Sequence, residues 1–348
     1  MNPQFRSIFD ASRLTRAGSL EAATQAIQRA LQSASTNAPV AFAHIPGRPP
    51  FFSAPAASTS AAMPSENFAT ASHSAAGLQR DYKLFVPSAR LEGRRQLVVM
   101  LHGCTQNPDD FAAGTAINAA AEEQGFYVLY PWQSDKANAQ RCWNWFKHSH
   151  QSRGRGEPEI IADMTRAVAA RHPVDLDRIY VAGLSAGGAM AAILGERYAD
   201  VFAAVAVHSG LPAGVATDLP SALALMKNGP AARSAASGKA IPTIVFHGDT
   251  DAVVHPANGD AVFDRSGGST ADIQVERLNK GGRACTRRTS RSADGKIMAE
   301  HWRIHGAAHA WSGGRAEGSY TDVRGPSATD EMMRFFGTHV GGQRKHMA

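Results

Sequence analysis

The chain has 348 residues, a length that suits one large domain with an appendage or two ordinary domains. Of these residues 43% are hydrophobic and 19% are charged, which is typical of a folded globular protein. The formal net charge is +6, but the basic residues are scattered and form no arm with interleaved aromatics, which argues against nucleic-acid binding. The three cysteines, Cys104, Cys142 and Cys285, include no CxxC pair, so no metal site is expected, and no apolar run is long enough to span a membrane.

Residues 1–32 contain one short amphipathic stretch, in which apolar residues recur at helical spacing: Leu20, Ala23, Ile27 and Leu31. This spacing predicts a helix that docks on the main domain; the alternative is a helix that contacts a membrane or a polymer granule. The N-terminus has no apolar core of signal-peptide length, and cysteines are few. These features predict a cytoplasmic location, unless a native signal sequence has been removed.

Residues 33–76 are rich in Ala, Ser, Thr and Pro and predict a linker or an extended surface strap. In residues 77–348, by contrast, apolar runs and helical patterns alternate, as expected of one catalytic-size domain. The runs predict strands at 82–87, 96–102, 126–131, 178–184, 202–208, 243–247 and 298–305, and the patterns predict helices at 110–124, 157–171 and 186–198. This alternation predicts an α/β fold with a mainly parallel sheet and helices on both faces.

The sequence Gly183-Leu184-Ser185-Ala186-Gly187 fits the pattern G-x-S-x-G and lies between a predicted strand and a predicted helix. The glycines are needed because the turn is sharp and side chains there would strike the neighbouring strand and helix. Such a turn projects the serine hydroxyl at a helix N-terminus, where backbone N–H groups favour developing negative charge. Ser185 is therefore the predicted nucleophile.

A nucleophilic serine needs a histidine base and an orienting acid, which follow in the order Ser, acid, His in folds of this kind. Asp249 and Asp251 both follow the predicted strand at 243–247; Asp251 is preferred because it lies further into the loop. His309 is the predicted base, since it lies in the loop after the last predicted strand. The other histidines near it are assigned structural or surface positions: His301, His305 and His339.

The oxyanion of an acyl-transfer reaction needs two N–H groups aimed at one point. Ala186 N–H, directly after the nucleophile, is the first candidate. Cys104 N–H, in the loop after the predicted strand at 96–102, is the second.

Several motifs follow one another in the order expected of one family: Leu101-His102-Gly103-Cys104-Thr105-Gln106, Cys142-Trp143-Asn144-Trp145-Phe146, the serine turn, His247-Gly248-Asp249-Thr250-Asp251, Gly306-Ala307-Ala308-His309-Ala310-Trp311-Ser312-Gly313-Gly314 and Gly318-Ser319-Tyr320-Thr321-Asp322. Together they resemble the poly(3-hydroxybutyrate) depolymerase family of esterases over about residues 77–340. The resemblance implies an α/β-hydrolase fold and a triad of Ser185, His309 and Asp251. It also implies a disulfide between Cys104 and Cys142, and no metal or organic cofactor.

The resemblance implies a carboxylic ester hydrolase that acts on poly(3-hydroxybutyrate) or related short-chain hydroxyalkanoate polyesters or oligomers. The family also contains feruloyl and acetylxylan esterases, which are the alternative. Gln106, Trp143, Trp145 and Trp311 are candidates for substrate contact; for the tryptophans, ordinary loop packing is the other interpretation. Two further hypotheses are a peptidase of the same fold and a non-catalytic protein that binds polymer granules.

Overall fold

The structure is a computed structural model that describes residues 67–88, 92–230, 241–268 and 272–341. Within these ranges one sheet contains β1 Phe68–Ala75, β2 Leu78–Phe85, β3 Arg95–Leu101, β4 Tyr127–Pro131, β5 Val174–Leu184, β6 Ala204–His208, β7 Thr243–Gly248, β8 Ile273–Lys280, β9 Arg283–Arg291 and β10 Ile297–Ile304. The short strands β11 Trp311–Ser312 and β12 Thr321–Asp322 pair with each other. The helices are α3 Pro108–Thr115, α4 Ile117–Gln124, α5 Gly156–Arg171, α6 Ala186–Arg197, α7 Leu219–Asn228, α8 Ala257–Phe263 and α9 Ala328–Gly337, with a 3-10 turn at His148–Gln151 and a π-type turn at Asp264–Gly268.

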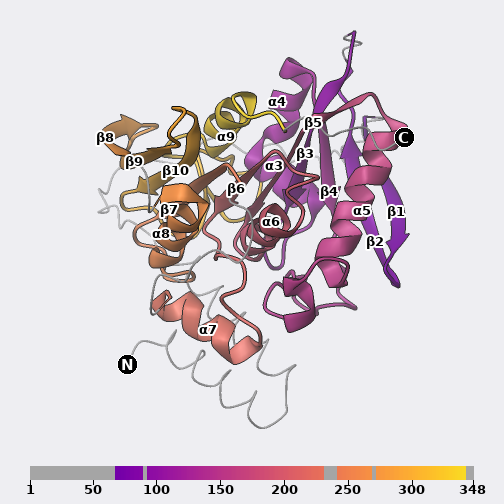
Figure 1. Cartoon of the computed structure of the whole chain (residues 1–348), viewed down its shortest axis with the longest axis horizontal. Helices are drawn as coiled ribbons and strands as arrows, with labels where there is room; N and C mark the ends of the chain where they lie inside the picture. Colours follow the sequence, from indigo (N-terminus) through magenta and orange to yellow (C-terminus); the bar gives the residue numbers. More distant parts are fainter. Residues whose placement is uncertain (1–66, 89–91, 231–240, 269–271, 342–348) are drawn as a thin grey trace, which may run out of the picture.

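The strand order is β1-β2-β4-β3-β5-β6-β7-β10-β9-β8. The strands from β4 to β10 in this order run parallel to one another, and an antiparallel pair extends the sheet at each end. Figure 1 shows α6 and α8 in front of this sheet, with α5 beside them. The prediction of a mainly parallel sheet is confirmed.

Side chains of the central strands alternate between two apolar cores, one on each face of the sheet, because successive strand residues point to opposite sides. In β3, Leu97, Val99 and Leu101 belong to one core, and Val98 and Met100 to the other. The first core also takes in α5, α6 and α8, and the second takes in α3, α4 and α9. Helices therefore cover both faces, as predicted.

β1 begins at Phe68, inside the segment 33–76 that was predicted as a linker or an extended surface strap, and it pairs antiparallel with β2 along its whole length. Most of its side chains are exposed, so its composition is that of an edge strand rather than of a buried one. The helix predicted at 110–124 is two helices, α3 and α4, divided at Ala116, which has the left-handed φ of 54°. His339 follows α9 and is 8% exposed, so the prediction of a surface position is also wrong.

The amphipathic segment 1–32 and most of the predicted linker 33–76 lie outside the described residues. Among the helices that the structure does describe, none is long and apolar enough to cross a membrane. The loops that follow β3, β5, β7 and β10 leave the same edge of the sheet, because these strands are parallel, and they carry the predicted site residues.

Candidate active site

Ser185 lies at a strained turn between β5 and α6. Its backbone has φ 59° and ψ −119°, a conformation that L-residues rarely adopt and that costs about 1–3 kcal/mol. The turn is held from the neighbouring strand, because Ser185 N–H donates to His208 O at 2.9 Å. Ala186 is the first residue of α6, so its N–H has no acceptor within the helix. Among the described residues no other acceptor takes this N–H, so an available donor lies directly beside the predicted nucleophile.

The two glycines of this turn are required by space. A Cβ on Gly187 would lie 2.0 Å from Leu101 O at the end of β3. A Cβ on Gly183 would lie 2.3 Å from the carbonyl carbon of Gly187. Both contacts are with backbone atoms, which cannot rotate away. The close packing of β3, β5 and α6 at this point therefore depends on the pattern that predicted it.

Asp251 is fully enclosed in the loop after β7 and has four contacts on its carboxylate. Oδ1 accepts from Val253 N–H at 2.9 Å and from Val254 N–H at 2.8 Å. Oδ2 accepts from His309 Nδ1 at 2.7 Å, and His247 Nε2 lies 3.4 Å from the same oxygen. Burial would raise the pKa of this carboxyl, but His309, His247 and the hydrogen bonds hold it well below its ordinary value. Asp251 is therefore a buried carboxylate aimed at His309.

Ser185 and His309 line the same small open cavity. No hydrogen bond joins the Ser185 hydroxyl to His309 within the described part of the chain. In enzymes without substrate such bonds are often long and tighten when substrate binds. The cavity brings four predicted site residues together, Cys104, Gln106, Ser185 and His309, and Gly103, Leu184 and Tyr320 complete its lining.

Asp249, the alternative acid, serves a different loop. Its carboxylate accepts from His305 Nδ1 at 2.7 Å and from Gly306 N–H at 2.7 Å. His305 Nε2 in turn lies 2.9 Å from Thr286 Oγ1 on β9. Asp249 thus fixes the start of the loop that carries His309, and among the described residues no hydrogen bond or ion pair joins it to His309 itself.

The loop after β3 leaves the Cys104 N–H without an acceptor among the described residues, while its neighbours are bonded. Gly103 N–H donates to Gln106 Oε1 at 2.9 Å. Gln106 Nε2 donates to Asp110 Oδ2 at 2.9 Å and to Ser319 O at 3.0 Å. Gln106 lines the cavity, but these bonds occupy its amide, so it holds the loop in place. The free Cys104 N–H is the group available to an oxyanion.

His102 supports the same loop from below. Gln133 N–H donates to its Nε2 at 3.2 Å, so Nε2 is an acceptor and the ring hydrogen is on Nδ1, which donates to Gly103 O at 2.8 Å. Burial lowers the pKa of His102 to about 4, although the bond to Gly103 opposes this shift. His102 is therefore a neutral structural group at neutral pH.

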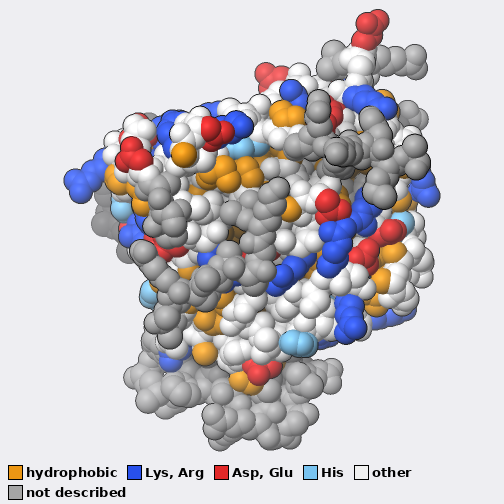
Figure 2. Space-filling view, in the orientation of Figure 1, with side chains coloured by type: hydrophobic (Ala, Val, Ile, Leu, Met, Phe, Trp, Pro, Cys, Tyr) orange, Lys and Arg blue, Asp and Glu red, His pale blue; other side chains and the backbone are white. Residues whose placement is uncertain are grey.

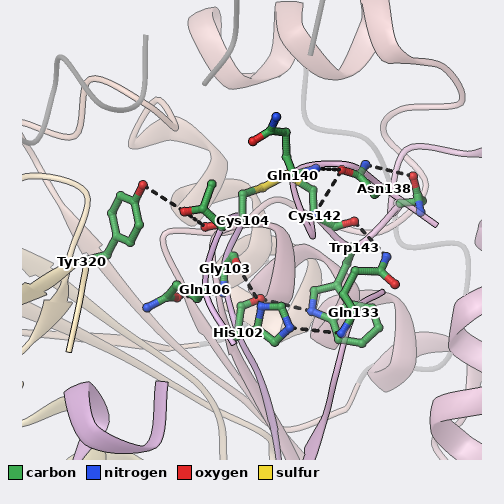
Figure 3. Close-up of a disulfide and its surroundings, with 12 residues drawn as sticks. His102, Gly103, Cys104, Gln106, Gln133, Asn138, Gln140, Cys142, Trp143 and Tyr320 are labelled. Atoms are coloured by element: carbon green, nitrogen blue, oxygen red, sulfur yellow. Dashed lines mark hydrogen bonds between the residues drawn. A yellow bond between two sulfur atoms is a disulfide. The ribbon is translucent and has the colours of Figure 1, made fainter. Parts of the chain in front are cut away.

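A disulfide joins Cys104 to Cys142 and ties the predicted oxyanion loop to the segment 138–142. Figure 3 shows the sulfur–sulfur bond above His102, with Tyr320 on one side and Gln133 on the other. Two hydrogen bonds run beside it: Thr105 N–H donates to Gln140 O at 2.7 Å, and Arg141 Nη2 donates to Thr105 O at 2.7 Å. The predicted oxyanion loop is thus held to the segment 138–142 by one covalent bond and two hydrogen bonds.

A buried carboxylate, Glu157, organises the segment behind the disulfide. It accepts from Gln133 Nε2 at 2.6 Å and from the backbone and side-chain nitrogens of Asn144, each at 2.7 Å. Burial raises its pKa, but His150, Gln133 and Asn144 together bring the pKa below the ordinary value. Gln133 Nε2 also donates to Cys142 O at 2.9 Å. The sequence does not indicate this network, because Glu157 is in the first turn of α5 while Gln133 and Asn144 lie in the segment before that helix.

The three tryptophans predicted as candidates for substrate contact are buried in the core instead. Trp143, Trp145 and Trp311 are 0%, 4% and 1% exposed, and none of them lines the cavity. Trp143 Nε1 donates to His102 O at 3.1 Å, and Trp311 stacks on His208 with ring centroids 5.1 Å apart. The packing interpretation therefore describes them. Their role is to support the loops that line the cavity.

Tyr320 is a cavity residue that sequence reasoning did not single out. It has the left-handed φ of 52°, and its hydroxyl lies 3.3 Å from Thr105 Oγ1. Its carbonyl accepts from Trp311 N–H at 2.7 Å, which places the ring beside Ser185 and His309. Its place in a quoted motif was the signal that could have revealed it.

On the face drawn in Figure 2 the Lys and Arg side chains are interspersed with acidic and apolar ones and form no single continuous basic patch. Several charged residues of the described part of the chain form ion pairs. Arg153 pairs with Asp200, and Arg287 with Glu276. Within the described ranges, no group of three or more His, Cys, Asp or Glu side chains is arranged to hold a metal ion.

The fold and the serine turn define the chain as an α/β-hydrolase. The profile of one family, Esterase PHB depolymerase, matches residues 80–278, which is more than half of the chain. The chain therefore belongs to this family of serine esterases.

Individual proteins give the same result. Poly(3-hydroxyalkanoate) depolymerase C of Paucimonas lemoignei is 34% identical over 236 residues, which cover 64% of this chain and 56% of that protein. Feruloyl esterase B of Thermothelomyces thermophilus is 31% identical over 146 residues, which cover 42% of this chain and 49% of that protein. The chain thus spans about half the length of these curated relatives.

The structure of an acetyl xylan esterase from Aspergillus awamori superposes with a TM-score of 0.60 and 18% sequence identity. The match covers 78% of this chain and 99% of the other. It confirms the predicted α/β-hydrolase fold.

Proposed function

We propose that this chain hydrolyses carboxylic esters through an acyl-enzyme formed on Ser185. The observation that carries the proposal is the hydrogen bond of 2.7 Å between the buried Asp251 carboxylate and His309, which shares a cavity with Ser185. Asp251 holds the His309 ring in the tautomer with hydrogen on Nδ1, so that Nε2 is the base. Its negative charge stabilises the imidazolium that forms during the reaction.

In the first step Ser185 Oγ attacks the ester carbonyl carbon while its proton passes to His309 Nε2. The oxyanion that forms is stabilised by the N–H groups of Ala186 and Cys104. The bond from the carbonyl carbon to the alcohol oxygen then breaks, and the alcohol leaves with the proton from His309. In the second step water attacks the acyl carbon, gives a proton to His309, and the acid is released as Ser185 regains its proton.

We propose poly(3-hydroxybutyrate) or related short-chain hydroxyalkanoate polyesters and oligomers as substrates. Support comes from the relative of Paucimonas lemoignei, which matches over more of this chain than the feruloyl esterase does. Feruloyl and acetylxylan esters are the second candidate, supported by the relatives of those names.

The experiment compares hydroxybutyrate oligomers, amorphous and crystalline polymer, methyl ferulate and acetylated xylan, with p-nitrophenyl butyrate as a general ester. Ser185→Ala is expected to lower kcat by about 10⁶ on every substrate that is hydrolysed. Near-normal activity in that variant would refute Ser185 as nucleophile. Activity confined to methyl ferulate or to acetylated xylan would overturn the polyester proposal, and release of product from a peptide alone would indicate a peptidase.

We also propose that the helix expected in residues 1–32 docks on the main domain, which the helical spacing of Leu20, Ile27 and Leu31 supports; contact with the surface of a polymer granule is the alternative. Ile27→Asp combined with Leu31→Asp is expected to lower the melting temperature and to leave adsorption to amorphous polymer unchanged. Reduced adsorption with an unchanged melting temperature would favour contact with the granule instead.

A further inference from the structure

A second buried imidazole, that of His247, faces the carboxylate that contacts His309. His247 lies in β7 and is 1% exposed. Its Nε2 lies 2.9 Å from Val254 O and 3.4 Å from Asp251 Oδ2. Both of those atoms are acceptors, so the ring hydrogen is on Nε2 and points between them. The bond to Val254 O is the closer one, and the contact with Asp251 is a longer electrostatic one.

The other ring nitrogen shows that packing alone does not explain a histidine here. His247 Nδ1 is buried and has no hydrogen-bond partner among the described residues. It faces Gly259 of α8, where an added Cβ would lie only 2.6 Å away. A buried unpaired nitrogen costs about 1–3 kcal/mol, which an apolar side chain of similar volume would avoid. The Nε2–H contact is the feature of the imidazole that such a side chain would lack.

The contact with Asp251 falls on the oxygen that matters for His309. Oδ1 is already held by the N–H groups of Val253 and Val254. Oδ2 is shared by His309 Nδ1 at 2.7 Å and His247 Nε2 at 3.4 Å. A donor on the far side of Oδ2 restricts rotation of the carboxylate away from His309.

Building on the proposed function, we propose that His247 is a positioning residue that acts through Asp251: its Nε2–H fixes the direction of Oδ2 and thereby the orientation of the His309 ring. The triad then has an outer fourth member in the order Ser185, His309, Asp251, His247. This member touches neither substrate nor nucleophile, so its effect falls on kcat rather than on KM.

The test compares three variants. His247→Leu removes the donor, and His247→Gln retains an amide N–H of similar reach. His301→Leu is the matched control, since His301 is a buried histidine on the adjacent strand β10, at 1% exposure. Neither of its ring nitrogens has a hydrogen bond among the described residues, and the nearest carboxylate, that of Asp260, lies 3.5 Å from Nδ1. We expect His247→Leu to lower kcat by about 10-fold to 100-fold, because a shift of about 1 Å in a catalytic group has that effect. KM is expected to stay unchanged in this variant. The kcat of His247→Gln should be close to that of the parent, and the kcat of His301→Leu should equal that of the parent.

A double-mutant cycle identifies the route of the effect. In an Asp251→Asn background, His247→Leu is expected to cause no further loss of kcat. A loss as large as in the parent would overturn the proposal, as would equal losses in His247→Leu and His301→Leu. If His247→Leu does not fold, His247→Gln is compared with His247→Asn instead. The asparagine side chain is too short to reach Oδ2, so equal kcat in these two variants would also overturn the proposal.

The rate at which a fluorophosphonate probe labels Ser185 separates this proposal from the proposed substrate. In labelling, Ser185 Oγ bonds to phosphorus, fluoride leaves, and the serine proton passes to His309. A parent protein that labels fast but hydrolyses none of the esters would refute the substrate and leave His247 testable by labelling rate. The expected labelling rates follow the same order as kcat, and a His247→Leu rate equal to that of the parent would refute the positioning role.

Discussion

Replacing Cys104 and Cys142 together by alanine opens a covalent loop with a sequence separation of 38 residues. Closing a loop of that length removes about 13 cal/mol/K of chain entropy from the unfolded state, or about 4 kcal/mol at room temperature. For a domain of this size each kcal/mol corresponds to about 2 °C in melting temperature. The double variant is therefore expected to melt about 8 °C lower than the oxidised parent.

The double variant should also hydrolyse esters more slowly, because the backbone N–H of residue 104 is one of the two proposed oxyanion donors. The loop keeps two anchors, the Thr105 N–H bond to Gln140 O and the Arg141 bond to Thr105 O, each 2.7 Å long. The N–H group is thus expected to shift without being lost. A shift of about 1 Å costs up to about 100-fold, so kcat should fall by about 10-fold to 100-fold, and KM should change less.

Calorimetry and the hydrolysis of p-nitrophenyl butyrate measure the two effects. A reductant should convert the parent to the behaviour of the double variant and should leave the double variant unchanged. Cys285→Ala controls for the remaining thiol, which is buried in β9, and should respond to reductant as the parent does. Unaltered melting and kcat in the double variant would refute this reasoning. Three free thiols in the unreduced, denatured parent would show that the bond is not formed.

Three further outcomes follow from the geometry. Asp251→Asn should lower kcat by about 10⁴, because the correct tautomer of His309 is lost, whereas Asp249→Asn should lower the melting temperature and leave kcat unchanged. Kinetic measurements on both variants test this, and the reverse result would show that Asp249 is the acid of the triad. Stability should fall as pH drops from about 6.5 to 5, because burial lowers the pKa of His102 to about 4 and of His208 to about 3. Below their ordinary value of 6.5 the unfolded chain binds protons that the folded chain does not, so each contributes a slope of about 1.4 kcal/mol per pH unit. The lowered pKa values of Asp251 and Glu157 affect stability only at lower pH, as their ordinary values of 3.8 and 4.5 are approached, so a change in stability between pH 6.5 and 5 reports on the histidines. Urea midpoints that stay constant over that range would contradict the prediction that these buried histidines are neutral. Gly187→Ala should cost about 3 kcal/mol or more by collision with Leu101 O, while Gly337→Ala, whose Cβ meets nothing within 4 Å, should change the melting temperature little; equal melting of the two variants would contradict the packing argument.

The parallel core of the sheet could be predicted because its strands are buried on both faces and read as apolar runs. The sheet edges could not. β1 exposes most of its residues, and β9 carries four arginines, so neither has the alternation that identifies a strand. The division between α3 and α4 was also hidden, since Ala116 adopts a left-handed conformation that alanine sequences do not indicate.

The candidate site was predictable where one residue type is forced by local geometry, as at Ser185 and Gly187. The candidate site was less predictable where a residue's role depends on the direction of its side chain. An aromatic residue in a loop motif can face the cavity or the core, and the spacing of Trp143 and Trp311 does not distinguish the two. The contact between His247 and Asp251 depends on the path of a loop that brings residue 251 back onto its own strand.

Strand β1 has a practical consequence for any shortened version of the protein. A chain cut at residue 77 would lose the strand that pairs with all of β2 and the Phe68 ring that packs edge-on against Tyr130 at 5.3 Å. β2 would then become the sheet edge and present unpaired backbone groups to other molecules. Such a fragment would keep every residue of the proposed triad and still self-associate. A shortened or redesigned version of the protein should therefore begin no later than Asn67.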